Sequence, residues 1–424
     1  MSQYSAKERI VARLLSATPR LKRSVKRAYV TLNAMLYRKP YKFRVLDPRC
    51  GAIESCVPEG MSFYGYYDRS PERNGRIAFH VPGIDTSRLP EASVPVELHV
   101  RTYATGSDIK IGETASYNWQ QGARMLWIDD NTLIYNDCRN DRYCAVIRDA
   151  TNGSERGCLP EPVQELVGHD SYLSVNPRRI TALQPDYGYR NLPKMTDAEL
   201  ADLAHDGIKR VSLTDGKVEM VHTLLDVVNT ESESGPANAR HCLNHVMASP
   251  SGSKFIFIHR WYENGRRHDR LILSDYSNLK VLADYGMVSH MVWVDEHTLF
   301  GYFRHKDTDG FHFIDTENGL ITPCEEANAL GQGDGHPSVH GNWVVFDSYP
   351  DRSRMQHLTL LNLKNHTIIP LLEIYHGLKY DRQTRCDLHP RFSDNGEKIW
   401  FDTVYDDVRQ LAVIDVSAIT KRDK

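Results

Sequence analysis

Four histidines occupy the same place in a short pattern that recurs along the chain, at the start of a strand-like apolar segment. They are His245, His290, His336 and His389, in a chain of 424 residues that has only 19 histidines. Imidazole nitrogens bind divalent metal ions and exchange protons near neutral pH. If the fold brings these side chains together, they form a cluster able to hold a metal or to act as a base.

Oxygen ligands that would complete a metal site lie close to two of these histidines. Asp387 is two residues before His389, and Gln332 and Asp334 belong to the GQGDGH segment that ends at His336. The alternative is structural, because a histidine at the start of a propeller strand can also hydrogen-bond the backbone of a neighbouring blade. Since the pattern occurs four times in succession, we favour a functional cluster and predict a metal site made of His290, His336, His389 and Asp387.

Cations, amides and aromatic side chains accompany the histidines. Arg124 is equivalent to His290 by an internal repeat, because residues 125–134 and 291–300 are identical at five of ten positions. Arg260 ends the strand that follows His245. Aromatic and amide side chains often bind carbohydrate by stacking and hydrogen bonding. We therefore predict substrate contacts by Arg124 together with Tyr66, Asn118, Trp119 and Gln120, although core packing between blades is the alternative for each aromatic residue.

The elements that position these residues are short strands. From about residue 60, apolar or alternating segments of strand length follow one another, separated by Gly, Asn, Asp and Pro. ITALQ at 180–184 is one of them, and residues 193–208 are the clear helical insertion. This density of strands indicates an all-β protein.

Repeats select the architecture. We call the residue just before each repeated strand its lead-in residue. The lead-in residues predict seven units, marked by Asp68, Arg124, Ser171, His245, His290, His336 and His389. Their spacing is compatible with four-stranded blades. The sequence therefore predicts a seven-bladed β-propeller over residues 45–420, in which equivalent residues of successive blades meet at one mouth of the central channel.

The N-terminal segment differs from the rest. Residues 1–44 contain twelve Lys and Arg against one acid, whereas the whole chain has a net charge of −3. Residues 5–37, with a break at Pro19, predict a basic amphipathic helix. It would either contact an anionic membrane surface or pack as a solvated helix on the flank of the propeller.

Composition excludes several classes of protein. The propeller segment has more acids than bases, so nucleic acid is not an expected ligand. No apolar run is long enough to span a membrane as a helix, and no secretory signal is visible. Eight scattered cysteines without a C-x-x-C pair fit reduced thiols. We expect a cytoplasmic protein, peripheral at the inner face of the membrane if the basic helix binds lipid.

Several motifs resemble oligogalacturonate lyases: NHVMASPSGSKFIFIHRW at 244–261, SHMVW at 289–293 and CDLHPRFSDNGEKIWFDT at 386–403. The FYGYYDRSP segment and the HRW strand end also look like ulvan lyases. Both are propeller polysaccharide lyases, and the resemblance covers most of residues 60–415. It implies a divalent metal ion (Mn, Zn or Ca) and an acidic oligo- or polysaccharide partner.

The resemblance also implies roles for individual residues. His245 matches a catalytic histidine, His290 and His389 match metal ligands, and Arg260 matches an arginine that binds the substrate carboxylate. This chain departs from the family at Asp387, where a histidine is usual, and at Thr384, which stands near the place of a glutamine. His336 is the expected substitute ligand.

These expectations lead to a lyase that cleaves a uronate glycan by β-elimination. His245 would be the base, Arg260 and the metal would neutralise the carboxylate, and Tyr67 would assist. Two alternatives remain. One is a non-catalytic scaffold or glycan-binding module associated with exopolysaccharide machinery. The other is a glycoside hydrolase, which requires two carboxylates across one pocket, whereas Asp68 is the only acidic lead-in residue.

Overall fold

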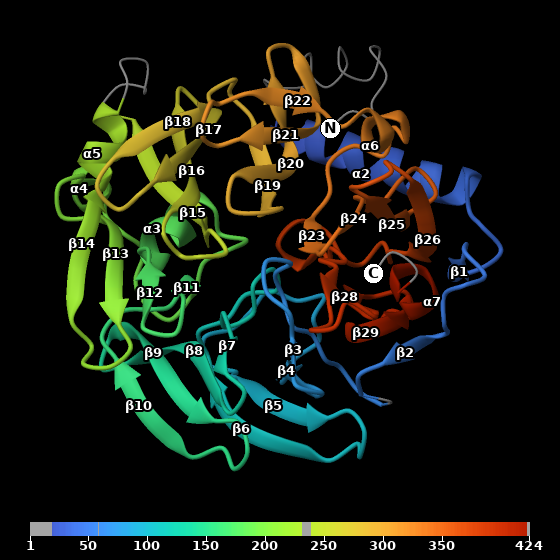
Figure 1. The fold of residues 1–424 in the computed structure, drawn as a ribbon, viewed down its shortest axis with the longest axis horizontal. Coiled ribbons are helices and arrows are strands. Elements are labelled where there is room, and N and C mark those ends of the chain that lie inside the picture. Colours follow the sequence, from blue (N-terminus) through green and yellow to red (C-terminus); the bar gives the residue numbers. More distant parts are fainter. Residues whose placement is uncertain (1–18, 58, 231–238, 422–424) are drawn as a thin grey trace.

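The computed structural model describes residues 19–57, 59–230 and 239–421. Seven antiparallel sheets surround a common centre (Figure 1), so the protein is a seven-bladed β-propeller, as the sequence predicts. The first three blades, in chain order, comprise β3 (Glu72–Arg73), β4 (Arg76–Pro82), β5 (Val96–Thr102) and β6 (Asp108–Thr114); β7 (Leu126–Asp129), β8 (Thr132–Arg139), β9 (Arg142–Asp149) and β10 (Glu155–Leu159); and β11 (Glu165–Val167), β12 (Ser171–Ser174), β13 (Gly207–Ser212) and β14 (Val218–Thr223).

The next two blades follow the same up-and-down order. They comprise β15 (Arg240–Ala248), β16 (Phe255–Glu263), β17 (Arg266–Ser274) and β18 (Leu279–Ala283), and then β19 (Val288–Trp293), β20 (Thr298–His305), β21 (Thr308–Asp315) and β22 (Ile321–Pro323). The first strands of blades three and four, five and six, and six and seven contact each other, which places them innermost.

The last two blades take strands from both ends of the chain. Blade six comprises β23 (Pro337–His340), β24 (Trp343–Asp347), β25 (Met355–Asn362), β26 (Ile368–Tyr375) and, at its outer edge, β1 (Phe43–Val45). Blade seven comprises β27 (Arg391–Phe392), β28 (Lys398–Thr403), β29 (Gln410–Asp415) and β2 (Ile53–Ser55). The N-terminal strands therefore close the ring, and the boundary expected at residues 44 and 45 falls inside β1.

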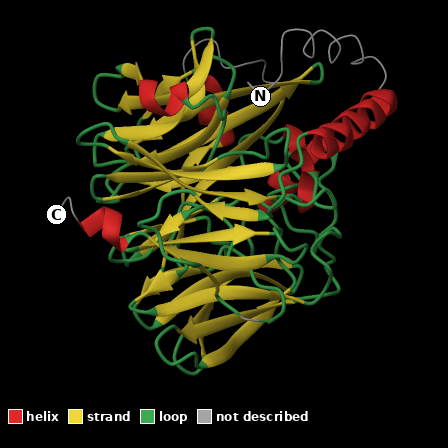
Figure 2. Ribbon diagram, turned by 90° about the vertical axis from the view of Figure 1, so that its right-hand side faces the viewer, coloured by secondary structure: helices red, strands yellow, loops and turns green. Residues whose placement is uncertain are grey.

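Helices lie outside the sheets. They are α2 (Pro19–Leu36), α3 (Pro177–Leu183), α4 (Asp197–Ala201), α5 (Leu224–Asn229), α6 (Glu325–Ala329), α7 (Ser417–Thr420) and the 3-10 turn η2 (Arg382–Thr384). The long helix α2 and the short α7 lie on opposite faces of the propeller (Figure 2). None of the helices in the described ranges is both long and apolar enough to cross a membrane. The part of the expected N-terminal helix before Pro19 lies outside the described residues.

The core lies between neighbouring blades. Phe79 of β4, Val146 of β9 and Trp400 of β28 belong to one buried cluster, although they come from three blades. In β5 buried and half-buried side chains alternate, as expected for a strand with one face on such a core.

Two details of the sequence prediction were wrong. The first four residues of ITALQ belong to helix α3, which begins after the capping residue Asn176, places Ile180 in the core and ends at the C-cap Gln184. In the predicted helix at 193–208, only Asp197–Ala201 is helical, and Gly207 already opens β13.

One of the seven markers was also misplaced. Ser171 begins β12, the second strand of blade three, whereas the innermost strand begins at Glu165. The innermost strand of that blade has only three residues, so the sequence pattern does not reveal it and the marker falls on the next strand.

Candidate metal and substrate site

A cavity of about 610 Å³ lies on the side of the propeller that carries α2. This volume falls within the usual range for small-ligand pockets. Its walls come from the starts of inner strands, from the loop after α3 and from α2. The polar lining residues include His245, His290, Asp334, Arg260, Arg267, Arg352, Arg354, Arg385, Asp186, Asp351, Tyr187 and Tyr349.

The four lead-in histidines form a continuous arc. Their ring centroids are separated by 5.9 Å from His245 to His290, by 3.9 Å from His290 to His336 and by 4.3 Å from His336 to His389. All four side chains are buried. The structure thus brings together residues from four blades that span 145 positions of the sequence.

Local irregularities of the backbone determine the direction of these histidine side chains. The pairing of β15 with β16 shifts register between Asn244 and Met247, and β19 has a similar shift between Val288 and Met291. Bulges of this kind redirect a side chain out of the regular pleat. His245 and His389 also have left-handed backbones, with φ of 54° and 45°. Such conformations are uncommon for residues other than glycine and concentrate at functional sites.

Hydrogen bonds to Nδ1 orient two of the rings. His336 Nδ1 contacts both oxygens of Asp347, at 2.9 and 3.1 Å, and His389 Nδ1 lies 2.8 Å from the Gly65 carbonyl oxygen. Within the described residues, Nε2 of each of these two rings is buried without a hydrogen-bond partner. An imidazole that donates from Nδ1 to an oxygen presents an unprotonated Nε2, which is the usual arrangement of a metal-ligating histidine.

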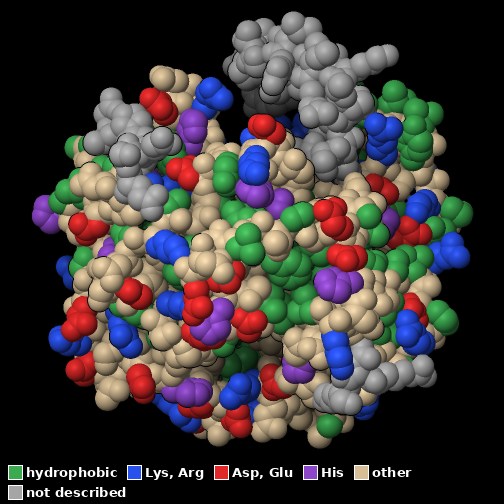
Figure 3. Space-filling model, turned by 45° about the horizontal axis from the view of Figure 1, so that its top comes forward, with side chains coloured by type: hydrophobic (Ala, Val, Ile, Leu, Met, Phe, Trp, Pro, Cys, Tyr) green, Lys and Arg blue, Asp and Glu red, His purple; other side chains and the backbone are tan. Residues whose placement is uncertain are grey.

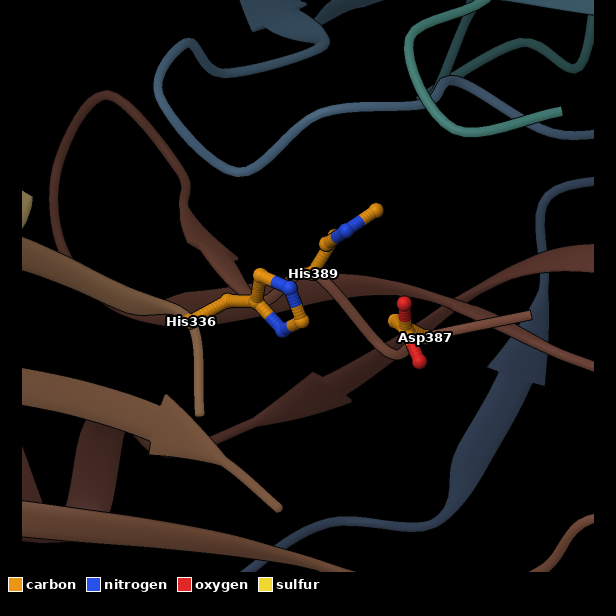
Figure 4. Close-up of side chains that lie close together, drawn as sticks. All are labelled: His336, Asp387 and His389. Atoms are coloured by element: carbon orange, nitrogen blue, oxygen red, sulfur yellow. The ribbon is translucent and has the colours of Figure 1, made fainter. Parts of the chain in front are cut away.

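Asp387 completes a group of three side chains that could hold a cation. One ligand atom each from His336, Asp387 and His389 lies within 4.8 Å of the other two (Figure 4). His290 adjoins this group through its contact with His336, and its Nδ1 lies 3.2 Å from Asp334. The unpartnered Nε2 atoms and the nearby carboxylate fit a divalent metal ion. The two imidazole nitrogens of this set suit Zn better than Ca, which prefers oxygen ligands.

Burial lowers the pKa values of the histidines in the arc. It lowers the pKa of His245 and of His389 well below the usual value, with further lowering from neighbouring cationic groups. Burial also lowers the pKa of His336, but the adjacent Asp347 carboxylate outweighs this effect, so the pKa of His336 is raised overall. His245 is therefore neutral at neutral pH, and both of its ring nitrogens are buried without a partner in the described residues.

Buried arginines bring positive charge to the cavity. Arg260 pairs through Nε with Asp269, which also pairs with Arg267 at 3.1 Å. Arg385 donates from Nε and one terminal nitrogen to Asp387, at 2.7 to 2.9 Å. Since each of these contacts leaves at least one terminal nitrogen of the guanidinium uninvolved, both arginines can still bind an anionic ligand group.

The two predicted tyrosines lie behind the arc. The Tyr67 hydroxyl donates to the Met291 carbonyl at 2.9 Å and accepts the Met291 N–H at 3.0 Å. These two hydrogen bonds to the backbone give Tyr67 a structural role in the described geometry. They do not support a catalytic role for its hydroxyl. The Tyr66 ring centroid is 5.3 Å from those of both His245 and His389, so Tyr66 packs against the arc.

The four other predicted substrate contacts lie elsewhere. Asn118 accepts the N–H groups of Gln120 and Gln121 in a turn, and Trp119 donates to the Arg88 carbonyl. Gln120 donates to the Arg385 carbonyl, and Arg124 pairs with Asp68 at 2.9 Å. These four residues are not among the described residues that line the cavity, so the site proposed below does not use them.

Sequence analysis missed several residues of the cavity. Tyr187 and Asp186 come from the loop after α3, inside the insertion of blade three, and Tyr349 follows β24. No lead-in pattern marks them. Arg385 had a visible signal, because it directly precedes the 386–403 motif and lies two residues before Asp387.

Comparisons with known proteins identify the fold but no family. No protein-family model matches the chain, and no curated protein matches it. Among solved structures, oligogalacturonate lyase from Vibrio parahaemolyticus matches with a TM-score of 0.58 and 14% identity, over 88% of this chain and 96% of that one. An oligogalacturonate lyase in complex with manganese matches with a TM-score of 0.59 and 16% identity, over 89% of this chain and 96% of that one. These likenesses show a shared propeller architecture.

Proposed function

We propose that the protein is a lyase that cleaves a uronate-containing oligosaccharide by β-elimination. The observation that carries the proposal is the buried, neutral and unpartnered His245 ring in a cavity that also presents Arg260 and Arg385. The architecture shared with two oligogalacturonate lyases adds support.

The chemistry requires neutralisation of the substrate carboxylate. The proton to be removed is on the carbon next to the carboxylate, and it is very weakly acidic while that group carries its full charge. Arginine side chains stabilise the negative charge that develops as the proton leaves. Arg260 and Arg385 are suited to this task because their internal pairs hold them rigidly in the cavity wall.

His336, Asp387 and His389 lie next to the cavity, behind its lining residues His290 and Arg385. A divalent cation held by these three side chains would add positive charge that helps to neutralise the carboxylate. The chain's own contribution there is orientation. Asp347 fixes the His336 ring, the Gly65 carbonyl fixes the His389 ring, and Arg385 fixes the Asp387 carboxylate.

His245 is the proposed base. Its pKa, lowered by burial, keeps the ring neutral and able to accept a proton. An anionic substrate beside the ring would raise this pKa and so strengthen the base in the complex. The low pKa of the ligand-free protein is therefore compatible with catalysis.

Tyr187 is the proposed proton donor to the departing oxygen. It lines the cavity, and its ring centroid is 5.4 Å from that of His245. Burial raises the pKa of Tyr187 to about 12, which keeps its hydroxyl protonated at neutral pH. The pair thus provides an acceptor and a donor of protons on one side of the cavity.

A panel of uronate oligosaccharides tests the proposal. The protein, with and without added Mn²⁺, would be incubated with oligomers of galacturonate, glucuronate, mannuronate and guluronate while the ultraviolet absorbance of the unsaturated product is followed. We expect turnover of at least one acidic oligomer and none of its methyl ester. Absence of unsaturated product from every uronate would overturn the lyase proposal, and binding without turnover would indicate a glycan-binding module.

A further inference from the structure

Helix α2 has two faces with different surroundings. Lys26, Tyr29, Val30 and Asn33 line the cavity. These positions are three or four residues apart, so they share one side of the helix. Helix α2 therefore contributes one of its sides to the wall of the cavity.

A neighbouring flank of α2 is apolar and exposed. Val25, Leu32, Met35 and Leu36 are between 40% and 69% exposed, and their spacing places Val25, Leu32 and Leu36 on the flank next to the cavity-lining side, with Met35 farther round the helix. Tyr37, Phe43 and Leu46 extend the exposed apolar surface beyond the helix. We call these seven residues the apolar stripe.

Exposed large hydrophobic side chains are concentrated in the apolar stripe. Across the described residues, fifteen large hydrophobic side chains are exposed, and seven of them lie between positions 25 and 46. Figure 3 shows hydrophobic side chains beside Lys and Arg at the upper right, the region in which Figure 1 draws α2. Isolated exposed apolar residues are ordinary, whereas a contiguous group marks a contact surface.

The charged residues of the segment that carries the stripe are all basic. Residues 19–46 contain nine Lys and Arg and no Asp or Glu. Lys39 and Lys42 pair with Glu373 and Asp406 of the propeller, while Arg27, Arg38 and Arg44 are exposed. Exposed cations beside large apolar side chains are the features that place a helix in the interface of an anionic bilayer.

We propose that the apolar stripe and its flanking arginines dock the protein on an anionic lipid membrane surface. The cavity-lining residues of α2 stay on the propeller while its exposed apolar flank enters the headgroup region. The cavity then lies on the membrane-facing side of the molecule. This inference rests on the composition and exposure of α2 and does not depend on the lyase proposal.

A membrane explains the stripe better than the two other occupants. A second copy of the chain would bring the same uncompensated positive charges together, which opposes association. An acidic protein partner would satisfy the charge but would not by itself require exposed Leu and Met side chains along the length of the helix.

Vesicle co-sedimentation of the full-length protein tests the proposal. Vesicles of phosphatidylcholine with phosphatidylglycerol would be compared with phosphatidylcholine alone. We expect binding to the anionic vesicles only, and the Leu32→Gln, Met35→Gln, Leu36→Gln triple variant to bind about tenfold more weakly or worse, since it loses the inserted apolar surface.

A matched triple variant controls for general changes in surface polarity. Leu89→Gln, Met220→Gln and Leu320→Gln also replace exposed apolar residues, but outside the stripe. This variant should bind vesicles as the unmodified protein does, and both triple variants should keep its thermal unfolding temperature.

The remaining outcomes overturn the proposal. They are absence of vesicle binding, equal binding to neutral vesicles, or binding that the stripe variant leaves unchanged, which would indicate adsorption by charge alone. A dimer in solution that the stripe variant converts to a monomer, without vesicle binding, would assign the surface to a second copy.

Discussion

Asp347 accepts the backbone N–H of His389 at 3.0 Å across the boundary between blades six and seven. Its other oxygen accepts the backbone N–H of His336 at 2.6 Å, and the side chain also contacts the His336 ring. One carboxylate at the end of β24 therefore positions both histidines of the candidate metal site.

Replacing Asp347 should weaken metal binding. In Asp347→Asn only one side-chain oxygen remains as an acceptor, and the charge that raises the pKa of His336 is lost. We expect the affinity for Mn²⁺, measured by titration calorimetry, to fall by about 10- to 100-fold. Asp149→Asn is the control, because Asp149 accepts the Thr151 N–H in the outer part of blade two. Equal affinity in the protein and the Asp347 variant would contradict this role.

Replacing His245 should abolish turnover without unfolding the protein. Asn tolerates the left-handed backbone at this position, and the His245 ring has no hydrogen bond to lose among the described residues. For His245→Asn we expect kcat to fall by about 10²- to 10⁴-fold with little change in thermal unfolding. His312→Gln, a buried histidine bonded to the Gly310 carbonyl, should retain activity. Retained turnover in His245→Asn would place the base elsewhere.

The pair of Arg385 and Asp387 should behave as a unit. Arg385→Gln leaves the Asp387 charge buried and unpaired, so we expect the free energy of unfolding to fall by about 3–5 kcal/mol. Adding Asp387→Asn removes that charge and should restore most of the loss. Urea denaturation of the two single variants and the double variant measures the coupling. Additive effects would show that the pair does not contribute jointly to stability.

Acid should destabilise the metal-free protein through its buried histidines. Burial lowers the pKa of His80 to about 4, and its Nε2 accepts the Ala123 N–H. Above pH 6.5 neither the folded nor the unfolded state protonates this ring. Between pH 6.5 and 4 only the unfolded state binds the proton, so the free energy of unfolding falls by about 3 kcal/mol over that window.

Urea denaturation at several pH values checks this slope, and His80→Gln should reduce it. His245 and His389, whose pKa values are also lowered, act in the same direction. His336 acts oppositely, because its raised pKa stabilises the folded state below pH 6.5 and this contribution is lost as pH rises through its folded pKa. Stability that does not change between pH 7 and 5 would contradict the prediction.

The architecture and the meeting of the four histidines could be predicted because both follow from local signals. Turn residues followed by apolar strands recur in each blade, and equivalent positions of a propeller converge on its axis. His245, His290, His336 and His389 therefore meet although their positions are far apart in the sequence.

The rest of the cavity could not be predicted in this way. Tyr187 comes from an insertion without a repeat, and its place depends on how α3 packs on blade four. The substrate contacts predicted at Asn118, Trp119 and Gln120 lie outside the cavity, because a polar and aromatic run in the sequence fits hydrogen bonding within the protein as well as a sugar site. Its side chains instead hydrogen-bond main-chain groups of the protein.

The N-terminal strands have a consequence for how the cavity arises. Helix α2 is joined to β1 by six residues, and β1 pairs with β26, while β2 completes blade seven. The wall that α2 contributes is thus anchored by contacts that exist only after both late blades have formed. Because β1 and β2 are synthesised long before their partners β26 and β29, closure of the ring and completion of the pocket coincide.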